Sequence, residues 1–251
     1  MSCVNIRGCR IGEGRPKVIL PIVERTEAAI LEKAAQFSTL QADCVEWRAD
    51  WFEGFQSPAA IARCVQKLRV ALRDKLLLMT FRTKAEGGEQ MLSHPEYLAF
   101  LRLILDTDCA DLLDIEFFTA GADLPKLVEQ AHSAGVAVVC SSHDFAKTPP
   151  RAELVSRMVQ MQQAGADLPK LAVMPQSRTD VLELLSATAE MADLHPETPV
   201  ITMSMGALGA VSRLAGETFG SAMTFANPGQ ASAPGQVSLD IVNEVLDALH
   251  L

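Results

Sequence analysis

Short apolar runs alternate with longer amphipathic segments along the whole chain, and this alternation restricts the folds that the chain can adopt. The apolar runs, typical of buried strands, cover residues 18–23, 44–49, 76–81, 112–117, 136–140, 168–174, 200–205 and 222–226. The amphipathic segments, typical of helices, cover residues 27–38, 58–73, 95–106, 124–134, 151–163, 178–192, 207–215 and 238–249. Eight strands that are each followed by a helix predict an α/β protein with a closed (β/α)8 TIM barrel.

An open doubly wound sheet is the competing α/β architecture. It has fewer strands and usually carries a glycine-rich phosphate loop after the first strand, and no such loop follows Val23. We expect residues 1–251 to form a single barrel domain, because no linker interrupts the alternation. Residues 1–15 contain two short apolar pieces around a turn and are expected to form a β-hairpin that closes the bottom of the barrel.

Composition excludes several classes of protein. A net charge of -9 argues against a nucleic-acid-binding protein, which needs a basic face. No run approaches the roughly 18 apolar residues of a membrane span, and the first residues lack the apolar core of a signal peptide, so we expect a cytoplasmic protein. The six cysteines show no C-x-x-C motif and no zinc-ligand spacing, so neither a disulfide nor a metal site is expected.

Side chains in a barrel strand alternate between the interior and the helix layer, so parity predicts which residues point inward. On the second strand the charged residues Glu46, Arg48 and Asp50 share one face, and the apolar residues share the other. The same parity on the later strands selects Thr80, Arg82, Asp114, Glu116, Ser141, His143, Lys170, Ala172, Met174, Met203, Met205, Met223 and Phe225. Because barrel enzymes place their chemistry at the strand C-terminal ends, this polar set predicts an active site there.

Lys170 stands in the middle of the apolar stretch 168–175, where a charged side chain is unexpected. A desolvated lysine amine is the group that forms imines with carbonyl substrates. Lys126 is an internal comparison, because residues 121–126 and 165–170 spell the same hexapeptide, yet a helical pattern follows Lys126. Only Lys170 is therefore expected to lie inside. The alternative is a lysine at the strand end whose amine reaches water.

His143 is expected at the exit of the neighbouring strand, where it can exchange protons near neutral pH, although a structural histidine is the alternative. Arg48, Arg82 and Arg213 are candidates for binding a carboxylate. The alternatives are internal ion pairs for Arg48 and Arg82, and a phosphate site for Arg213. Residues 227–236, with Ser232 and Gln236, are expected to form either a loop that closes over a substrate or an ordinary flexible connector.

Taken in order, these residues resemble the type I 3-dehydroquinate dehydratases over nearly the whole chain. The motifs that carry the resemblance are Glu46-Trp47-Arg48-Ala49-Asp50, Phe81-Arg82-Thr83 with Glu86-Gly87-Gly88, Ser142-His143-Asp144-Phe145, residues 170–175, Met203-Ser204-Met205-Gly206, Ser212-Arg213 and residues 232–236. The resemblance implies a cofactor-free barrel enzyme of the shikimate pathway, which serves aromatic amino-acid biosynthesis. Its substrate would be 3-dehydroquinate, its product 3-dehydroshikimate, and its assembly a homodimer.

The resemblance also implies a role for each site residue. Lys170 would form the imine, His143 would be the general acid and base, and Glu86 and Asp114 would orient His143 or its surroundings. The residues that would hold the substrate are Glu46, Arg48, Arg82, Arg213, Ser232 and Gln236, with Met203 and Phe225 beside it and with Asp50 and Ala233 in support. Pro21 departs from the family pattern, because relatives often carry serine there, so it is left out of the site.

Two other functions share these features. A class I aldolase would use the same lysine and barrel to break a carbon–carbon bond, often in a phosphorylated substrate. A non-catalytic barrel would bind the ligand and gain stability without forming product. The Lys170 and His143 pair argues against this second alternative.

Overall fold

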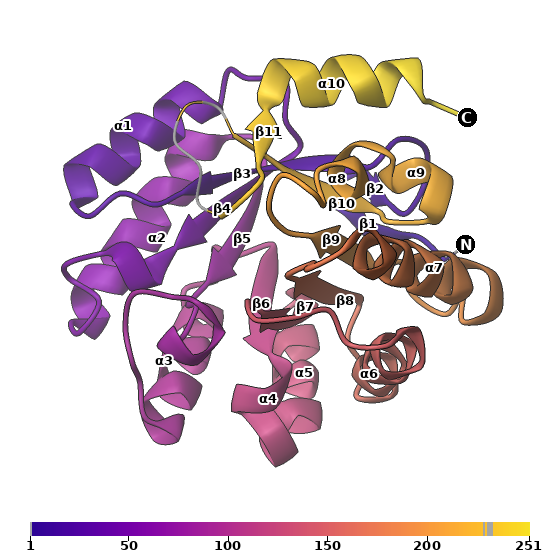
Figure 1. Ribbon diagram of the computed structural model, residues 1–251. Helices are drawn as coiled ribbons and strands as arrows, with labels where there is room; N and C mark the ends of the chain where they lie inside the picture. Colours follow the sequence, from indigo (N-terminus) through magenta and orange to yellow (C-terminus); the bar gives the residue numbers. More distant parts are fainter. Residues whose placement is uncertain (1, 228, 230–232) are drawn as a thin grey trace.

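A curled parallel sheet surrounded by helices forms the molecule (Figure 1). This computed structural model describes residues 2–227, 229 and 233–251. The main sheet has the order β11-β10-β3-β4-β5-β6-β7-β8-β9. Its strands are β3 (Lys17–Ile22), β4 (Cys44–Arg48), β5 (Leu76–Thr80), β6 (Leu112–Glu116), β7 (Ala137–Asp144), β8 (Leu168–Val173), β9 (Ile201–Ser204), β10 (Met223–Asn227) and β11 (Val237–Ser238).

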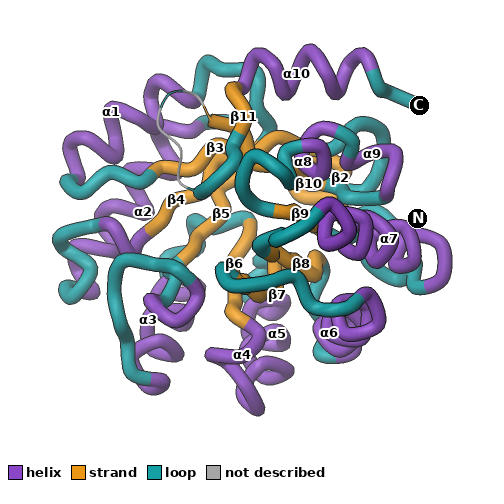
Figure 2. Tube along the Cα trace, in the orientation of Figure 1, coloured by secondary structure: helices purple, strands orange, loops and turns teal. Residues whose placement is uncertain are grey.

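Helices connect successive strands and cover the outside of the sheet (Figure 2). The α-helices are α1 (Glu27–Phe37), α2 (Pro58–Leu72), α3 (His94–Asp106), α4 (Phe117–Ala120), α5 (Leu124–Ser133), α6 (Arg151–Gln163), α7 (Arg178–Leu194), α8 (Val211–Leu214), α9 (Gly216–Phe219) and α10 (Leu239–Ala248). Short 3-10 helices are η1 (Ala49–Trp51), η2 (Lys84–Glu86) and η3 (Gly121–Asp123). The predicted α/β barrel is confirmed.

The barrel closes between β9 and β10 through a short contact. Val200 and Ser221 form an isolated parallel bridge, and the Ala222 N–H donates to the Val200 carbonyl oxygen at 2.8 Å. The Ser221 hydroxyl adds a side-chain contact, because it accepts the Thr202 N–H at 3.0 Å. These bonds satisfy backbone groups that an open sheet edge would leave unpaired.

An antiparallel hairpin of β1 (Val4–Ile6) and β2 (Cys9–Ile11) precedes the barrel. Ile11 is fully buried in the apolar cluster that fills the barrel interior, and Val4, Ile6 and Cys9 pack against that cluster. The hairpin therefore contributes apolar surface to the inside of the barrel.

Two hydrophobic clusters confirm the predicted strand parity. The inner cluster contains one set of alternate residues, among them Cys44, Leu78 and Leu112. The outer cluster lies against the helices and contains the other set, such as Val45 and Trp47. Toward the strand C-terminal ends the inward positions become polar, which leaves the site residues on rigid strands.

Several predicted element bounds differ from the structure, and three of the differences affect residues near the site. Residues 207–215 do not form one helix but precede and include the short α8, because Gly209 packs so closely that a Cβ would lie 2.2 Å from the Ser204 carbonyl oxygen. The strand expected at 136–140 continues to Asp144 as β7, so His143 lies within it. The second strand ends at Arg48, which places Asp50 in η1.

No helix among the described residues combines the length and apolar character that crossing a membrane requires. All six cysteines are free thiols, and Cys44, Cys64 and Cys140 are buried.

Candidate active site

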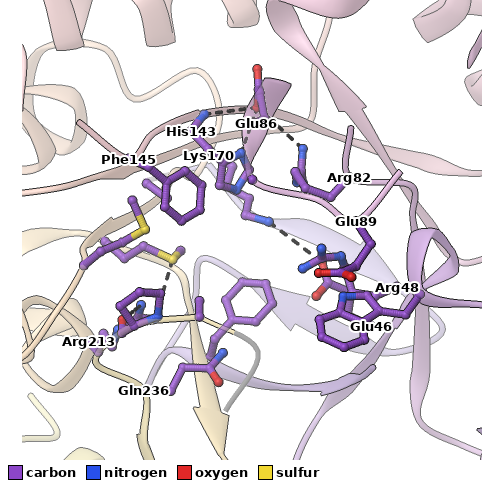
Figure 3. A pocket seen from close by; sticks show the side chains of 18 residues that line it. Glu46, Arg48, Arg82, Glu86, Glu89, His143, Phe145, Lys170, Arg213 and Gln236 are labelled. Atoms are coloured by element: carbon purple, nitrogen blue, oxygen red, sulfur yellow. Dashed lines mark hydrogen bonds and ion pairs between the residues drawn. The ribbon is translucent and has the colours of Figure 1, made fainter. Parts of the chain in front are cut away.

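A pocket of about 260 Å³ lies at the C-terminal ends of the barrel strands (Figure 3). Charged and apolar side chains from β4, β7, β8, β9 and β10, and from the loops that follow the strands, contribute to its wall. The lining residues are Glu46, Arg48, Trp51, Arg82, Glu86, Gly87, Glu89, His143, Phe145, Lys170, Ala172, Met203, Met205, Arg213, Phe225, Ala233, Pro234 and Gln236. Eleven of the predicted site residues are thus brought together in one pocket: Glu46, Arg48, Arg82, Glu86, His143, Lys170, Met203, Arg213, Phe225, Ala233 and Gln236.

Lys170 projects from β8 into this pocket and is only 3% exposed. Its Nζ lies 3.3 Å from Asp114 Oδ2 and 3.9 Å from Glu46 Oε1. The same nitrogen lies 4.7 Å from the centre of the Phe225 ring, within the range of a cation–π contact. Lys126, in the identical hexapeptide, is exposed on α5. The prediction that Lys170 is interior is confirmed, and the alternative of an amine in open water is wrong.

His143 faces the pocket from β7, the strand beside Lys170. Ser141 pairs in register with Lys170, and His143 pairs with Ala172. His143 Nδ1 lies 2.8 Å from Glu86 Oε2, and the same carboxylate oxygen accepts the His143 backbone N–H at 3.1 Å. Burial, together with the positive charges of Arg82, Lys170 and Arg48, lowers the pKa of His143 well below its usual range. The imidazole is therefore neutral at neutral pH and can accept a proton.

Glu86 ends the 3-10 helix η2 and is nearly buried, with 6% of its surface exposed. Burial raises the pKa of Glu86 to about 8, and the nearby Glu116 and Asp114 carboxylates add to the rise, against the lowering effect of Arg82. The Glu86–His143 pair can thus take up or release a proton near neutral pH, which acid–base catalysis requires.

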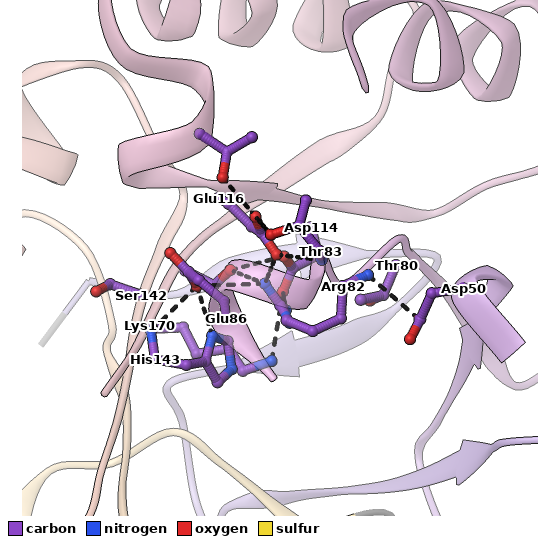
Figure 4. Close-up of polar contacts among 12 residues, drawn as sticks. Asp50, Thr80, Arg82, Thr83, Glu86, Asp114, Glu116, Ser142, His143 and Lys170 are labelled. Atoms are coloured by element: carbon purple, nitrogen blue, oxygen red, sulfur yellow. Dashed lines mark hydrogen bonds and ion pairs between the residues drawn. The ribbon is translucent and has the colours of Figure 1, made fainter. Parts of the chain in front are cut away.

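Arg82 is the centre of a buried ionic network behind the pocket (Figure 4). Its guanidinium contacts Asp114 Oδ2 at 2.8 Å, Glu116 Oε1 at 2.9 Å and Ser141 Oγ at 2.9 Å. Glu86 Oε2 lies 3.6 Å away. Burial alone would lower the pKa of Arg82, but the surrounding carboxylates raise it well above its usual value. The internal ion pairing considered for Arg82 is therefore present, although the residue also lines the pocket.

Asp114 and Glu116 complete this network from β6. Burial would raise the pKa of Asp114, but Arg82 and Lys170 lower it below its usual value. Asp114 contacts Lys170, Arg82 and the Ser141 hydroxyl, so it supports the amine rather than His143. Glu116 was expected to face inward but was not included among the site residues, and its carboxylate also accepts the Thr83 N–H at 2.9 Å.

Arg48 is held by Asp50 in a bidentate ion pair. Arg48 Nε donates to Asp50 Oδ1 and Nη2 to Oδ2, both at 2.7 Å. Asp50 is fully buried and also accepts the backbone N–H groups of Arg82 and Glu89. Asp50 therefore lies behind the pocket and fixes the position of Arg48. Nearby, Glu46 Oε1 accepts the Thr80 hydroxyl at 2.9 Å, which orients its carboxylate.

Arg213 lies across the pocket from Glu86 in Figure 3, and its electrostatic situation differs. It is 1% exposed, and its guanidinium contacts Met203 Sδ at 3.6 Å and the Pro234 carbonyl oxygen at 3.3 Å. Its buried Nε has no hydrogen-bond partner, and no carboxylate within residues 2–227, 229 and 233–251 pairs with it. Burial lowers the pKa of Arg213 to about 10. A buried cation without an acidic partner is a ready site for a ligand carboxylate.

Some residues considered from the sequence do not line the pocket, and some lining residues were not predicted. Ser232 lies outside the described residues. Pro21 is buried on β3 beside Glu46 in register and does not line the pocket. Ala172 and Met205 line the pocket as parity predicts. Five lining residues were not predicted as site residues: Trp51, Gly87, Glu89, Phe145 and Pro234. Gly87, Phe145 and Pro234 lie within the motifs that carry the family resemblance, but strand alternation does not apply to them because they follow strand ends. Within the described chain, no cluster of three acidic, histidine or cysteine side chains is arranged to hold a metal ion.

Comparisons with known proteins identify the family. The family model for type I 3-dehydroquinase matches residues 18–251. The 3-dehydroquinate dehydratase of Bacillus subtilis is 46% identical over 250 residues, covering 100% of this chain and 98% of that protein. That of Clostridium kluyveri is 47% identical over 251 residues, covering 100% and 97%.

Solved structures agree with the sequence comparisons. The type I 3-dehydroquinate dehydratase of Clostridium difficile, solved with covalently modified comenic acid, has a TM-score of 0.96 and 43% identity and covers 99% of this chain and 98% of that one. The enzyme of Enterococcus faecalis has a TM-score of 0.93 and 41% identity, covering 99% and 100%. A family match over residues 18–251 and close relatives of equal length lead to one conclusion: the chain belongs to the type I 3-dehydroquinase family, the 3-dehydroquinate dehydratases.

Proposed function

We propose that the chain dehydrates 3-dehydroquinate to 3-dehydroshikimate through an imine on Lys170, as a step of the shikimate pathway toward aromatic amino acids. The observation that carries this proposal is the position of Lys170, a buried amine that shares one pocket with the His143–Glu86 pair. The Clostridium difficile relative contains covalently modified comenic acid, which supports covalent chemistry in a site of this kind.

The first step forms the imine. The neutral amine of Lys170 attacks the ketone carbon, the carbonyl oxygen leaves as water after two protonations, and a protonated C=N bond replaces the C=O bond. The carboxylates of Asp114 and Glu46 and the face of Phe225 surround Nζ, so they stabilise the positive charge that this step leaves on nitrogen.

The second step moves protons at the adjacent carbons. His143 removes the alpha proton. The electron pair of that C–H bond forms a C=C bond to the imine carbon, and the C=N electron pair moves onto nitrogen, which gives a neutral enamine. The enamine then expels the beta hydroxyl, which leaves as water with a proton from the His143–Glu86 pair. Water hydrolyses the unsaturated imine, which releases 3-dehydroshikimate and restores the Lys170 amine.

The remaining side chains bind and orient the substrate. Arg213 binds the carboxylate, because it is the buried cation that lacks an acidic partner in the described chain. Hydroxyls of the ring are held on the opposite wall by Glu46 and Arg48, with Arg82 behind them. The residues that complete the enclosure are Gln236, the apolar Met203, Phe225 and Ala233, and Asp50 behind Arg48. By analogy with the family, Ser232 would also bind the substrate. Bound in this way, the substrate places its ketone at Lys170.

The proposal is tested by two lysine variants in the same hexapeptide. We expect Lys170→Met to lower kcat by roughly 10⁴-fold or more, as loss of a catalytic nucleophile does, and Lys126→Met to leave turnover of 3-dehydroquinate unchanged. Product is identified by chromatography, which also separates the alternatives: an aldolase would give two cleavage fragments, and a binding barrel would give no product. Normal turnover by Lys170→Met would contradict the proposal.

A further inference from the structure

Phe145 lines the pocket beside His143 and Gly87, although it contributes to neither hydrophobic cluster of the described chain. The residue is 42% exposed. One face of its ring lies nearly parallel to the His143 ring, with ring centres 6.5 Å apart and an angle of 18° between the planes. Figure 3 shows the ring directly beside His143 at the edge of the pocket.

The ring is also seated on Gly87, the residue that follows Glu86. A Cβ at Gly87 would lie 2.3 Å from the Phe145 ring, closer than any two such atoms can approach. Gly87 has a φ of 84°, so it also turns the chain away after η2. The absence of a side chain at Gly87 therefore lets the ring rest against the backbone of the loop that carries Glu86.

The segment that carries Phe145 is fixed from its other side. Asp144 Oδ1 accepts the backbone N–H groups of Ala146 and Lys147, both at 2.9 Å, in a closed turn. The Lys147 carbonyl oxygen accepts the Met174 N–H at 3.3 Å, which attaches this turn to the end of β8. These bonds fix the backbone that follows Phe145.

The group beneath the ring is sensitive to water. The His143 side chain is 10% exposed, and Glu86 Oε1 is buried without a hydrogen-bond partner. The charged groups that face His143 from the neighbouring elements are Glu86, Arg82, Arg48 and Lys170, with Asp114 and Glu116 beyond them. A water molecule admitted at the mouth would reach the unpartnered Oε1 and hydrate both members of the pair.

We propose that Phe145 is a positioning residue for the dehydration: seated on Gly87, its ring keeps water from the His143–Glu86 pair and so keeps the imidazole neutral and available as the base. This inference rests on the proposed function, because it assigns the His143–Glu86 pair to proton transfer. It concerns the environment of the pair rather than contact with the reacting atoms.

The test is a titration of His143 in the free enzyme, which needs no turnover. In protein with ¹³C-labelled histidine, the His143 signal is identified by its loss in His143→Ala and followed against pH by NMR. We expect Phe145→Ala to shift the His143 titration to higher pH, toward that of an ordinary histidine, because desolvation is the largest cause of its lowered value. Phe145→Leu, which keeps an apolar cover, should titrate close to the unmodified protein.

Activity should follow the titration. Because a protonated imidazole cannot remove the alpha proton, the acidic limb of kcat/KM against pH should move to higher pH in Phe145→Ala. Near the acidic end we expect a loss of about tenfold that recovers as the pH rises. A role in substrate binding alone would raise KM equally at all pH values and would leave the NMR titration in place.

Gly87→Ala tests the seat of the ring, and Gly8→Ala is its matched control. Gly8 has a φ of 83° and no atom within 4 Å of a built Cβ, so both variants carry the same backbone strain but only Gly87→Ala displaces Phe145. We expect Gly87→Ala to reproduce the Phe145→Ala shift and Gly8→Ala to show none. An unshifted His143 titration in Phe145→Ala would overturn the inference. Failure of the imine mechanism would appear separately, as normal turnover by Lys170→Met.

Discussion

Of two arginines that line the pocket, Arg48 pairs with a buried carboxylate and Arg213 does not. We therefore expect Arg48 to contribute to stability and Arg213 to contribute to substrate binding. Arg48 donates from Nε and Nη2 to the two carboxylate oxygens of the buried Asp50, so its charge is compensated within the protein. Arg213 is as deeply buried but pairs with no carboxylate of the described chain. Such a cation costs folding free energy that only a bound anion can recover.

This contrast predicts different stability effects for matched variants. Arg48→Met should lower the free energy of unfolding by roughly 3–5 kcal/mol, because it leaves Asp50 as an uncompensated buried charge. Arg213→Met should change that free energy by less than about 1 kcal/mol or increase it, while raising KM roughly 100-fold through loss of the carboxylate contact. Urea denaturation and steady-state kinetics check both. Equal destabilisation by the two variants would contradict the assignment.

The side-chain direction of individual site residues was predictable from the sequence where the residue lies on a strand. Parity alone indicated the inward direction of Glu46, Lys170 and Met203, and the pattern after each lysine separated Lys170 from Lys126. Phe145 and Trp51 follow strand ends, where the direction of a side chain depends on the turn rather than on alternation. Arg82 was predictable as an inward residue, but its several carboxylate partners depend on the distances between strands.

A hydrogen bond from a strand N–H to a polar side chain before the next strand recurs at the bottom of the barrel. Asp43, Asp111 and Asp167 each precede a strand, and each carboxylate accepts a backbone N–H from the strand before it. The Ser221 hydroxyl does the same for β9. The same hydrogen bond therefore links β3 to β4, β5 to β6, β7 to β8 and β9 to β10. It gives an acceptor to N–H groups near the start of each first strand.

Loss of one of these hydrogen bonds should lower the free energy of unfolding and leave kcat/KM unchanged. Asp43→Ala removes the acceptor 2.7 Å from the buried Val18 N–H, which should lower the free energy of unfolding by roughly 1–3 kcal/mol. The control is Asp74→Ala at an exposed position on the same end of the barrel. Chemical denaturation gives the free energies, and kcat/KM of both variants should match that of the unmodified enzyme. A stable Asp43→Ala, or one with impaired turnover, would count against this interpretation.

Element bounds show where sequence patterns stop being informative. The eight strands and most helices were predictable, because each buries one face and repeats its period. The segment 207–215 has a helical pattern, yet its backbone leaves the helix where Gly209 contacts Ser204. That contact depends on how the segment packs against β9, which no local pattern contains.

For the whole molecule, the buried Glu86 links stability to pH. Its pKa is raised from 4.5 to about 8, mainly by burial, so the folded state favours the protonated acid. The stability it contributes is fully present below pH 4.5 and is lost as the pH rises to 8. Relative to the unmodified protein, Glu86→Gln should therefore gain roughly 2–5 kcal/mol between pH 5 and pH 9. Urea denaturation across this range measures it, with exposed Glu32→Gln as control; a constant difference would refute the link.

A homodimeric assembly and a single domain over residues 1–251 stay predictions. We propose a homodimer by analogy with the family, which light scattering would report as twice the 27.1 kDa mass of the chain. The division of residues 1–251 into one domain would be supported by a single cooperative unfolding transition.

The central claim is that the Lys170 amine condenses with the substrate ketone, and chemical trapping tests it most directly. Borohydride reduction in the presence of 3-dehydroquinate, followed by peptide mass spectrometry, should give a stable adduct on the peptide that contains Lys170. His143→Ala should still form this adduct while its turnover falls roughly 10²–10⁴-fold, because it loses proton transfer but keeps the nucleophile. An adduct on Lys126, or turnover with no adduct at all, would contradict the account.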